Sequence, residues 1–281
     1  MELTDKYGTP LFVFDEVTLV KNFERFKQAF ENVYSKVMVC YSIKTNNNLA
    51  ICRILKESGA HAEVSSLLDL HIASRAGFTG EKIIYDGPFK PVEALKEALR
   101  MKVLLINCES FAELERLNEI AGKFGVQQAV GLRVNPFTRP SFLKSLHPKI
   151  LLEEAAFCFP KCRFGFSIEE TRRAFNYLKK MKNLRLECLM MHPYYRAISI
   201  LIPLFREAYE KFGFEIKYLN IGGGFDPGTC GYIGDLPLVL DYVKEKIGLK
   251  SSLNGKRNVS NIEKAAKTVV ENLMRNLDGL P

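Results

Sequence analysis

Short apolar runs alternate with amphipathic stretches along most of the chain. Between the runs, apolar residues recur every three or four positions, as in PVEALKEALRM and SFAELERLNEIAGKFG, which predicts amphipathic helices. The first four runs recur about every twenty residues, the spacing of successive strand–helix units. Seven runs have the length and composition of strands, and they lie at 37–44, 62–66, 82–87, 103–108, 129–135, 186–192 and 216–223.

This alternation predicts a parallel sheet covered by helices, and the near-continuous apolar strands suit burial on both faces. Both an open doubly wound sheet and a barrel share the pattern. A barrel draws its site from the ends of many strands, whereas an open sheet concentrates it at one switch point. We favour the α/β barrel because special residues end nearly every predicted strand: Lys44, Ser66, Asp86, Asn107, Arg133, His192 and Gly222.

Two segments do not follow this alternation of strands and helices. The run TPLFVFD at 9–15 predicts an additional strand, followed by a helix. The stretch 137–162 is irregular and broken by prolines, which predicts an active-face loop with a short helix or a poorly ordered insertion. No linker divides the sequence, so a single domain over 1–281 is expected.

Composition narrows the class of protein. The apolar fraction is 47% and the charged fraction 26%, which is typical of a soluble globular chain, and no apolar run is long enough for a membrane span. The start lacks a secretory signal, and seven dispersed cysteines without a CxxC pair indicate reduced thiols in the cytoplasm rather than zinc ligands. The net charge of +8 is spread over amphipathic helices, which favours a solvated surface over a nucleic-acid site.

Lys44 and a run of three glycines are the first candidates for chemistry. Lys44 ends the strand in YSIKTN, where partial desolvation frees an amine for Schiff-base chemistry; the alternative is a lysine that reaches solvent. Gly222, Gly223 and Gly224 follow a late strand, where their N–H groups can cradle a phosphate; the alternative is a tight turn. Without a GxGxxG pattern, a dinucleotide site is disfavoured.

A histidine and an arginine complete the candidate set. His192 closes LECLMMH, where its ring can stack on a flat cofactor, move protons, or simply pack in the barrel. Arg133 lies inside the apolar strand GLRVNP and therefore needs an anionic partner, for which Glu63 is a candidate. A structural ion pair explains Arg133 as well as a site role does. All these groups would face one mouth of a barrel.

At these residues the sequence resembles the alanine-racemase-like group of pyridoxal-phosphate enzymes, specifically the diaminopimelate and ornithine decarboxylases. YGTPLFVFDE is similar to their N-terminal signature, and YSIKTN to their Tyr-Ala-Val-Lys-Ala-Asn motif. AEVSSLLDL resembles their Asp-Val-Xaa-Ser segment, GLRVNP their Arg-Val/Ile-Asn-Pro strand, and NIGGGF their phosphate-binding glycines. These motifs occur in the family's order and span residues 7–280.

The resemblance implies that pyridoxal 5'-phosphate is the cofactor and that Lys44 binds it covalently. His192 is implied to stack on the cofactor ring and, with Lys44, to act in catalysis. The cofactor-binding residues that the resemblance implies are Lys44, Glu63, Ser66, Arg133, His192, Gly222, Gly223 and Gly224.

The sequence also departs from the family. The family's His-Ile/Val-Gly-Ser is HPYY at 192–195, which loses two phosphate-side residues, and Pro193 has no N–H. Its Ser-Lys-Phe-Gly is CRFG at 162–165. No counterpart of the eighth strand, Glu-Pro-Gly-Arg, or of the C-terminal β-domain follows LMRNLDGLP. We therefore expect an incomplete (β/α)8-type TIM barrel of about seven strands.

The implied function is decarboxylation of a basic amino acid, with diaminopimelate, in lysine biosynthesis, favoured over ornithine. Two alternatives stay open: a barrel that binds pyridoxal phosphate without turnover, and one part of a split decarboxylase. Because the acid that pairs with the cofactor's ring nitrogen lies on the family's eighth strand, slow turnover by this chain alone is expected. A homodimer or a complementing C-terminal chain is the expected partner, with neither nucleic acid nor membrane.

Overall fold

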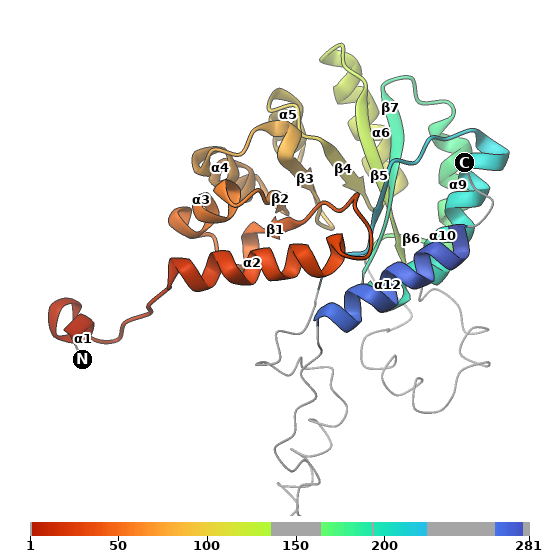
Figure 1. Ribbon diagram of the computed structural model, residues 1–281. Coiled ribbons are helices and arrows are strands. Elements are labelled where there is room, and N and C mark those ends of the chain that lie inside the picture. Colours follow the sequence, from red (N-terminus) through yellow and green to blue (C-terminus); the bar gives the residue numbers. More distant parts are fainter. Residues whose placement is uncertain (1, 136–163, 193, 224–261, 278–281) are drawn as a thin grey trace, which may run out of the picture.

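The computed structural model describes residues 2–135, 164–192, 194–223 and 262–277. Within these residues, seven parallel strands form one sheet in the order β1-β2-β3-β4-β5-β7-β8, and the short β6 pairs with the end of β5. The sheet curls into an incomplete TIM-type barrel with helices on its outer side (Figure 1). The strands are β1 (Cys40–Ser42), β2 (His61–Val64), β3 (Ile83–Tyr85), β4 (Leu105–Cys108), β5 (Gln128–Asn135), β6 (Phe166–Ser167), β7 (Leu184–Met191) and β8 (Tyr218–Asn220).

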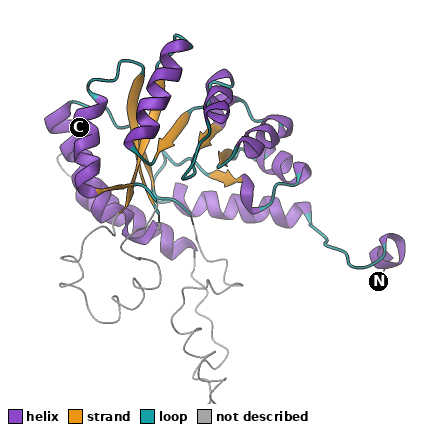
Figure 2. Ribbon diagram, turned by 180° about the vertical axis from the view of Figure 1, so that it is seen from behind, coloured by secondary structure: helices purple, strands orange, loops and turns teal. Residues whose placement is uncertain are grey.

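All the helices except α1 lie against the sheet, mostly on its outer face, where their apolar sides and the outward side chains of the strands form the main core (Figure 2). In the described part of the chain, none of them is both long and apolar enough to cross a bilayer. The α-helices are α1 (Glu2–Tyr7), α2 (Glu16–Glu31), α3 (Leu49–Glu57), α4 (Leu67–Ala76), α5 (Val92–Arg100), α6 (Phe111–Lys123), α9 (Ile168–Leu178), α10 (Tyr194–Phe212) and α12 (Ile262–Leu277), and 3-10 turns lie at Ile43–Thr45 and Gly80–Lys82.

Polar caps fix the point at which several helices leave the sheet. The side chains of Ser66, Ser110 and Ser167 each accept a hydrogen bond from the backbone N–H three residues later, at the starts of α4, α6 and α9. Asn48 caps α3 through a bond from the N–H of Ala50, at 2.9 Å. Each cap satisfies an N–H group that the helix itself leaves without a partner. The strand-to-helix turns, which carry the candidate site, are therefore held in defined conformations.

The seven strands predicted from the apolar runs are confirmed, with most of them shorter than their runs. The strand predicted at 9–15 is wrong: this segment pairs with no strand of the described residues, and Phe12 is 88% exposed. Figure 1 shows it as the connection to α1, which lies away from the sheet. The two-residue β6 has no signature in the sequence pattern. The predicted loop over 137–162 lies outside the described residues.

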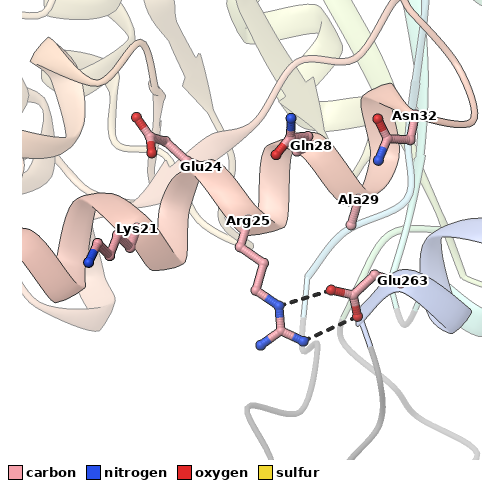
Figure 3. A pocket seen from close by; sticks show the side chains of 7 residues that line it. All are labelled: Lys21, Glu24, Arg25, Gln28, Ala29, Asn32 and Glu263. Atoms are coloured by element: carbon pink, nitrogen blue, oxygen red, sulfur yellow. Dashed lines mark hydrogen bonds and ion pairs between the residues drawn. The ribbon is translucent and has the colours of Figure 1, made fainter.

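Helices α2 and α12 pack together near the two edge strands of the sheet, β1 and β8. Ala29 and Phe30 of α2 share a buried cluster with Ala266, Val269 and Val270 of α12. At the surface of this seam, Arg25 and Glu263 form a two-point ion pair, with Nε–Oε1 at 2.9 Å and Nη2–Oε2 at 3.2 Å (Figure 3). In the described residues β1 and β8 do not pair with one another. Helices α2 and α12 are thus in contact, although the described edge strands β1 and β8 do not pair.

Candidate functional site

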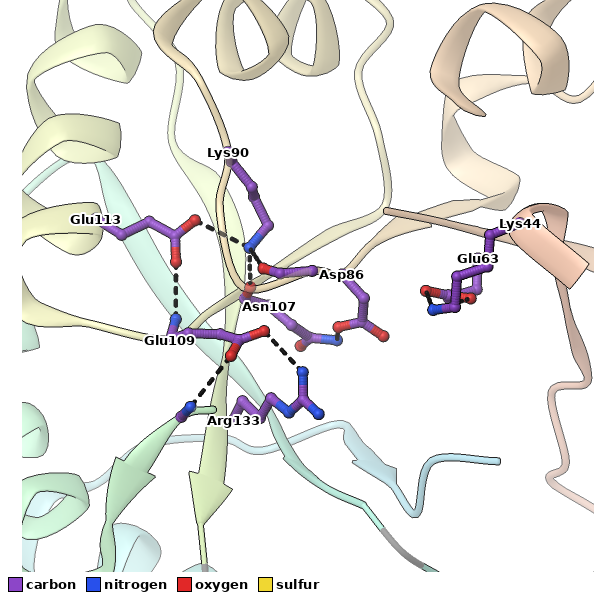
Figure 4. A network of polar contacts seen from close by, with 10 residues as sticks. Lys44, Glu63, Asp86, Lys90, Asn107, Glu109, Glu113 and Arg133 are labelled. Carbon is purple, nitrogen blue, oxygen red and sulfur yellow. Dashed lines mark hydrogen bonds and ion pairs between the residues drawn. The ribbon is translucent and has the colours of Figure 1, made fainter. Parts of the chain in front are cut away.

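The inward side chains of the sheet change from apolar to polar towards the carboxyl ends of the strands. Below this change lies an apolar floor of buried residues, comprising Ile84, Leu105, Ala129, Cys188 and Met190. Inward side chains recur every two residues along a strand. The next inward positions above the floor carry polar groups. We call these the polar rim: Glu63, Asp86, Asn107, Arg133 and His192. Figure 4 shows the first four close together at this end of the sheet.

Lys44 lies in the 3-10 turn that follows β1 directly. The register of β1 and β2 pairs Ser42 with Glu63, which brings the Glu63 carboxylate next to the turn. The Lys44 Nζ atom lies 3.1 Å from Glu63 Oε1. The Lys44 side chain is 59% exposed, so of the two possibilities that the sequence left open, the lysine that reaches solvent is the one found. A carboxylate, rather than burial, holds the amine at the rim.

Asp86 and Asn107 occupy the rim above β3 and β4. The Asn107 Nδ2 group donates to Asp86 Oδ1 at 2.7 Å. The Asn107 side chain fits because residue 131 is glycine: a Cβ atom there would lie 1.9 Å from Asn107 Oδ1. Burial, and next the charge of Glu63, raises the pKa of Asp86 to about 6. A carboxyl group so placed titrates near the pH at which acid–base chemistry is useful.

Replacing Asp86 with asparagine should stabilise the fold more at pH 7 than at pH 4. The raised folded-state pKa means that stability falls as pH rises from the ordinary value of 3.8 to about 6, because the folded chain retains a proton that the unfolded chain releases. Asparagine removes this loss and can still accept from Asn107. We expect a gain on the order of 3 kcal/mol at pH 7 relative to pH 4, measured by urea unfolding. If the free energies of unfolding of the variant and the wild type differed by the same amount at pH 4 and pH 7, this prediction would be contradicted.

Arg133 pairs with a different acid from the one predicted. Its Nη1 atom lies 2.8 Å from Glu109 Oε1, whereas Glu63 is engaged by Lys44. The register explains the choice, because Cys108 of β4 pairs with Leu132 of β5 and the next residues along are therefore neighbours. Two strands separate β2 from β5. The Arg133 guanidinium also lies over the ring of Phe164, 4.6 Å from its centroid.

His192 contacts the glycine turn that follows β8. The N–H of Gly223 donates to His192 Nδ1 at 3.3 Å. Burial, followed by the charges of Arg133 and Lys44, lowers the pKa of His192, which favours the neutral imidazole. The bond from Gly223 uses Nδ1 as its acceptor. Gly222 has φ +72, and a Cβ atom there would lie 2.6 Å from His192 Nδ1. Only glycine allows this close approach.

Six of the predicted site residues therefore lie at one end of the sheet: Lys44, Glu63, Arg133, His192, Gly222 and Gly223. The Ser66 hydroxyl is occupied as the cap of α4, where it accepts from the N–H of Asp69 at 3.1 Å. Gly224 lies outside the described residues.

The sequence did not reveal a set of buried charges behind the rim, formed by Lys90, Glu109 and Glu113. The last two flank Ser110 in ESFAE, a spacing that signals only a helix start. Lys90 stands between Phe89 and Pro91 in a connecting segment, where nothing in the pattern marks it as buried.

The residues at the rim fit a flat, anionic aldehyde. Lys44 supplies a primary amine, and Arg133 adds a second positive charge. The imidazole of His192 supplies a flat, uncharged ring. Beside it, a Cβ atom added at Gly223 would meet no described atom within 4 Å, so the backbone at this point is open to a ligand. These features match pyridoxal phosphate.

Known proteins resemble this chain in sequence. Diaminopimelate decarboxylase of Aquifex aeolicus (strain VF5) is 35% identical over 267 residues, which cover 89% of this chain and 60% of the relative. Diaminopimelate decarboxylase of Haemophilus influenzae is 28% identical over 232 residues, covering 79% and 53%. The chain thus spans about half to three-fifths of the length of these curated relatives.

Solved structures give the same picture. AQ1208 from Aquifex aeolicus is 28% identical with a TM-score of 0.72, over 99% of this chain and 57% of that one. Diaminopimelate decarboxylase from M. jannaschii in co-complex with L-lysine is 25% identical with a TM-score of 0.75, covering 99% and 59%. The family model for the pyridoxal binding domain of the pyridoxal-dependent decarboxylases matches residues 17–248. The chain therefore belongs to the pyridoxal-dependent decarboxylase family and contains that family's pyridoxal binding domain.

Proposed function

We propose that this chain is the cofactor-binding part of a decarboxylase that acts on a basic amino acid, with diaminopimelate as the favoured substrate. The observation that carries the proposal is the Lys44 amine at the strand-end rim, paired to Glu63 and facing the same end of the sheet as Arg133 and His192. The names of the relatives support the substrate class. Ornithine, lysine and arginine are the amino acids against which diaminopimelate is to be compared.

Each of the predicted site residues has a role that follows from its chemistry. When bound, pyridoxal phosphate supplies the electron sink for loss of carbon dioxide. Lys44 holds the cofactor's aldehyde carbon, and Glu63 accepts from the Lys44 Nζ group and so orients it. His192, kept neutral, packs its ring against the cofactor. Gly222 and Gly223, followed by Gly224, offer backbone N–H groups to the phosphate, and Arg133 adds positive charge. Ser66 is proposed as a further contact near the cofactor.

The test is carbon dioxide release by the purified chain with saturating pyridoxal phosphate. Diaminopimelate, ornithine, lysine and arginine are supplied separately, with Lys44→Ala as the inactive control. We expect release from diaminopimelate to exceed that from the other three by at least about tenfold, the scale that one well-placed polar contact can provide. A preference for another amino acid would overturn the substrate proposal. Retained cofactor without release from any of the four would fit both a cofactor carrier and one part of a split decarboxylase. Recovery of release on adding a complementing C-terminal chain would identify the split enzyme.

Association with a second chain, as a homodimer or with a complementing C-terminal chain, stays a prediction from the sequence. Sedimentation of the purified chain with and without pyridoxal phosphate would test it.

A further inference from the structure

A fully buried lysine anchors a set of charges behind the polar rim. The Lys90 side chain is 0% exposed, and its Nζ atom donates to three acceptors. These are the carbonyl oxygens of Gly87 and Asn107, at 2.8 and 2.6 Å, and Glu113 Oε1, at 2.9 Å. The ammonium has three protons and therefore a partner for each. A buried cation with this geometry is rigidly placed.

Glu113 connects Lys90 to the backbone of Glu109. Its second oxygen, Oε2, accepts from the backbone N–H of Glu109 at 2.7 Å. Its own N–H donates to the Ser110 hydroxyl that caps α6. The turn between β4 and α6 is thus held from both sides. The backbone of Glu109 has little freedom as a result.

Both carboxylate oxygens of Glu109 accept hydrogen bonds from groups near the polar rim. Oε1 lies 2.8 Å from Arg133 Nη1, and Oε2 accepts from the N–H of Gly165 at 3.1 Å. The side chain is only 4% exposed, and that of Arg133 only 14%. Gly165 has φ +71, and a Cβ atom there would lie 2.4 Å from the Arg133 carbonyl oxygen, so this contact needs glycine. Figure 4 shows the chain of contacts from Lys90 to Arg133.

This arrangement does more than satisfy a buried charge. Arginine carries a long side chain whose freedom must be lost before the guanidinium can act at a fixed point. Glu109 removes that freedom in advance, while Lys90 and Glu113 remove the freedom of Glu109. A buried network of this kind acts as a unit, because each member orients the next. The last member is a residue of the candidate cofactor site.

We propose that Glu109 is a positioning residue of the cofactor site, which holds the Arg133 guanidinium at the polar rim from a backbone fixed by Glu113 and Lys90. This inference rests on the proposed function, because it assigns Arg133 a role towards pyridoxal phosphate. Glu109 itself need not touch the cofactor. Its effect on cofactor binding passes through Arg133.

A double-mutant cycle on cofactor affinity tests this. Pyridoxal phosphate is titrated into the full chain and into Glu109→Gln, Arg133→Met and the double variant, with bound cofactor followed by its visible absorbance. Glu109→Gln alone is expected to weaken affinity about tenfold, within the range of coupling for residues in contact. In the Arg133→Met background the same change should alter affinity less than about twofold. A role confined to stability would shift the unfolding midpoint but not this difference.

Further variants keep the outcomes separate. Glu119→Gln removes an exposed glutamate of α6 that is paired with Lys123, and it should leave cofactor affinity unchanged. Glu109→Asp retains the charge with a shorter reach and takes the place of Glu109→Gln in the cycle if the latter does not fold. Equal losses in both backgrounds, or none in either, would overturn the positioning role while the wild-type titration still supports the proposed function. No binding by the wild type would overturn both.

Discussion

Lys44→Ala should abolish the pyridoxyl label that borohydride reduction leaves on the wild-type chain after incubation with pyridoxal phosphate. Lys44 has the amine that the rim presents beside Glu63 and within electrostatic reach of His192. Alanine removes the only atom of that side chain able to bond the aldehyde carbon, so the expected loss at this position is complete. Mass mapping of peptides gives the site and the stoichiometry of the label.

Lys123→Ala is the matched control for this experiment. Lys123 is also an exposed lysine paired with a glutamate, but it lies on the outer helix α6. Its loss should leave the label on Lys44 at wild-type stoichiometry. If Lys44→Ala kept a full equivalent of label at another lysine, the assignment of the cofactor site to the polar rim would fail.

Lys90→Met should cost the fold about 3–5 kcal/mol, the range for breaking a buried ion pair by removing one partner. Methionine fills much of the same space but leaves the buried Glu113 carboxylate without its cation. The carbonyl oxygens of Gly87 and Asn107 also lose a charged donor. Urea unfolding at pH 7 measures the change in free energy of unfolding.

Lys96→Met provides the comparison. Lys96 pairs with Glu93 on the solvent side of α5, where water screens the interaction. The unfolding midpoint of this variant should match the wild type. A Lys90→Met chain that lost less than about 1 kcal/mol would show that the buried network contributes little, and that Glu113 finds another partner when Lys90 is absent.

The strands were predictable where the apolar run is long and continuous. The structure places β5 and β7 at Gln128–Asn135 and Leu184–Met191, within two residues of the runs 129–135 and 186–192. The segment 9–15 has the same apolar character but is not a strand, because strand formation also requires a neighbour to pair with. A single sequence does not show whether one exists. The brief β6 is too short to generate a pattern.

The candidate site was predictable in its members but not in its pairings. Lys44, Arg133 and His192 could be placed at one end of a barrel because each lies at or near the end of a predicted strand. The resemblance to the family added Glu63. The partner of Arg133 could not be predicted, because it depends on the register of β4 against β5, which places Glu109 alongside. Lys90 was missed for a related reason: its burial depends on the path of the connection after β3.

The seam between α2 and α12 has a consequence for the order of events during synthesis. Arg25 and Glu263 are separated by 238 positions, so this contact forms only after nearly all of the described chain has left the ribosome. Contacts of such separation are slow to form. Until α12 emerges, the apolar side of α2 around Ala29 and Phe30 has no α12 to cover it. Nascent chains halted before residue 262 should therefore be the ones most readily captured by chaperones that bind exposed apolar helices.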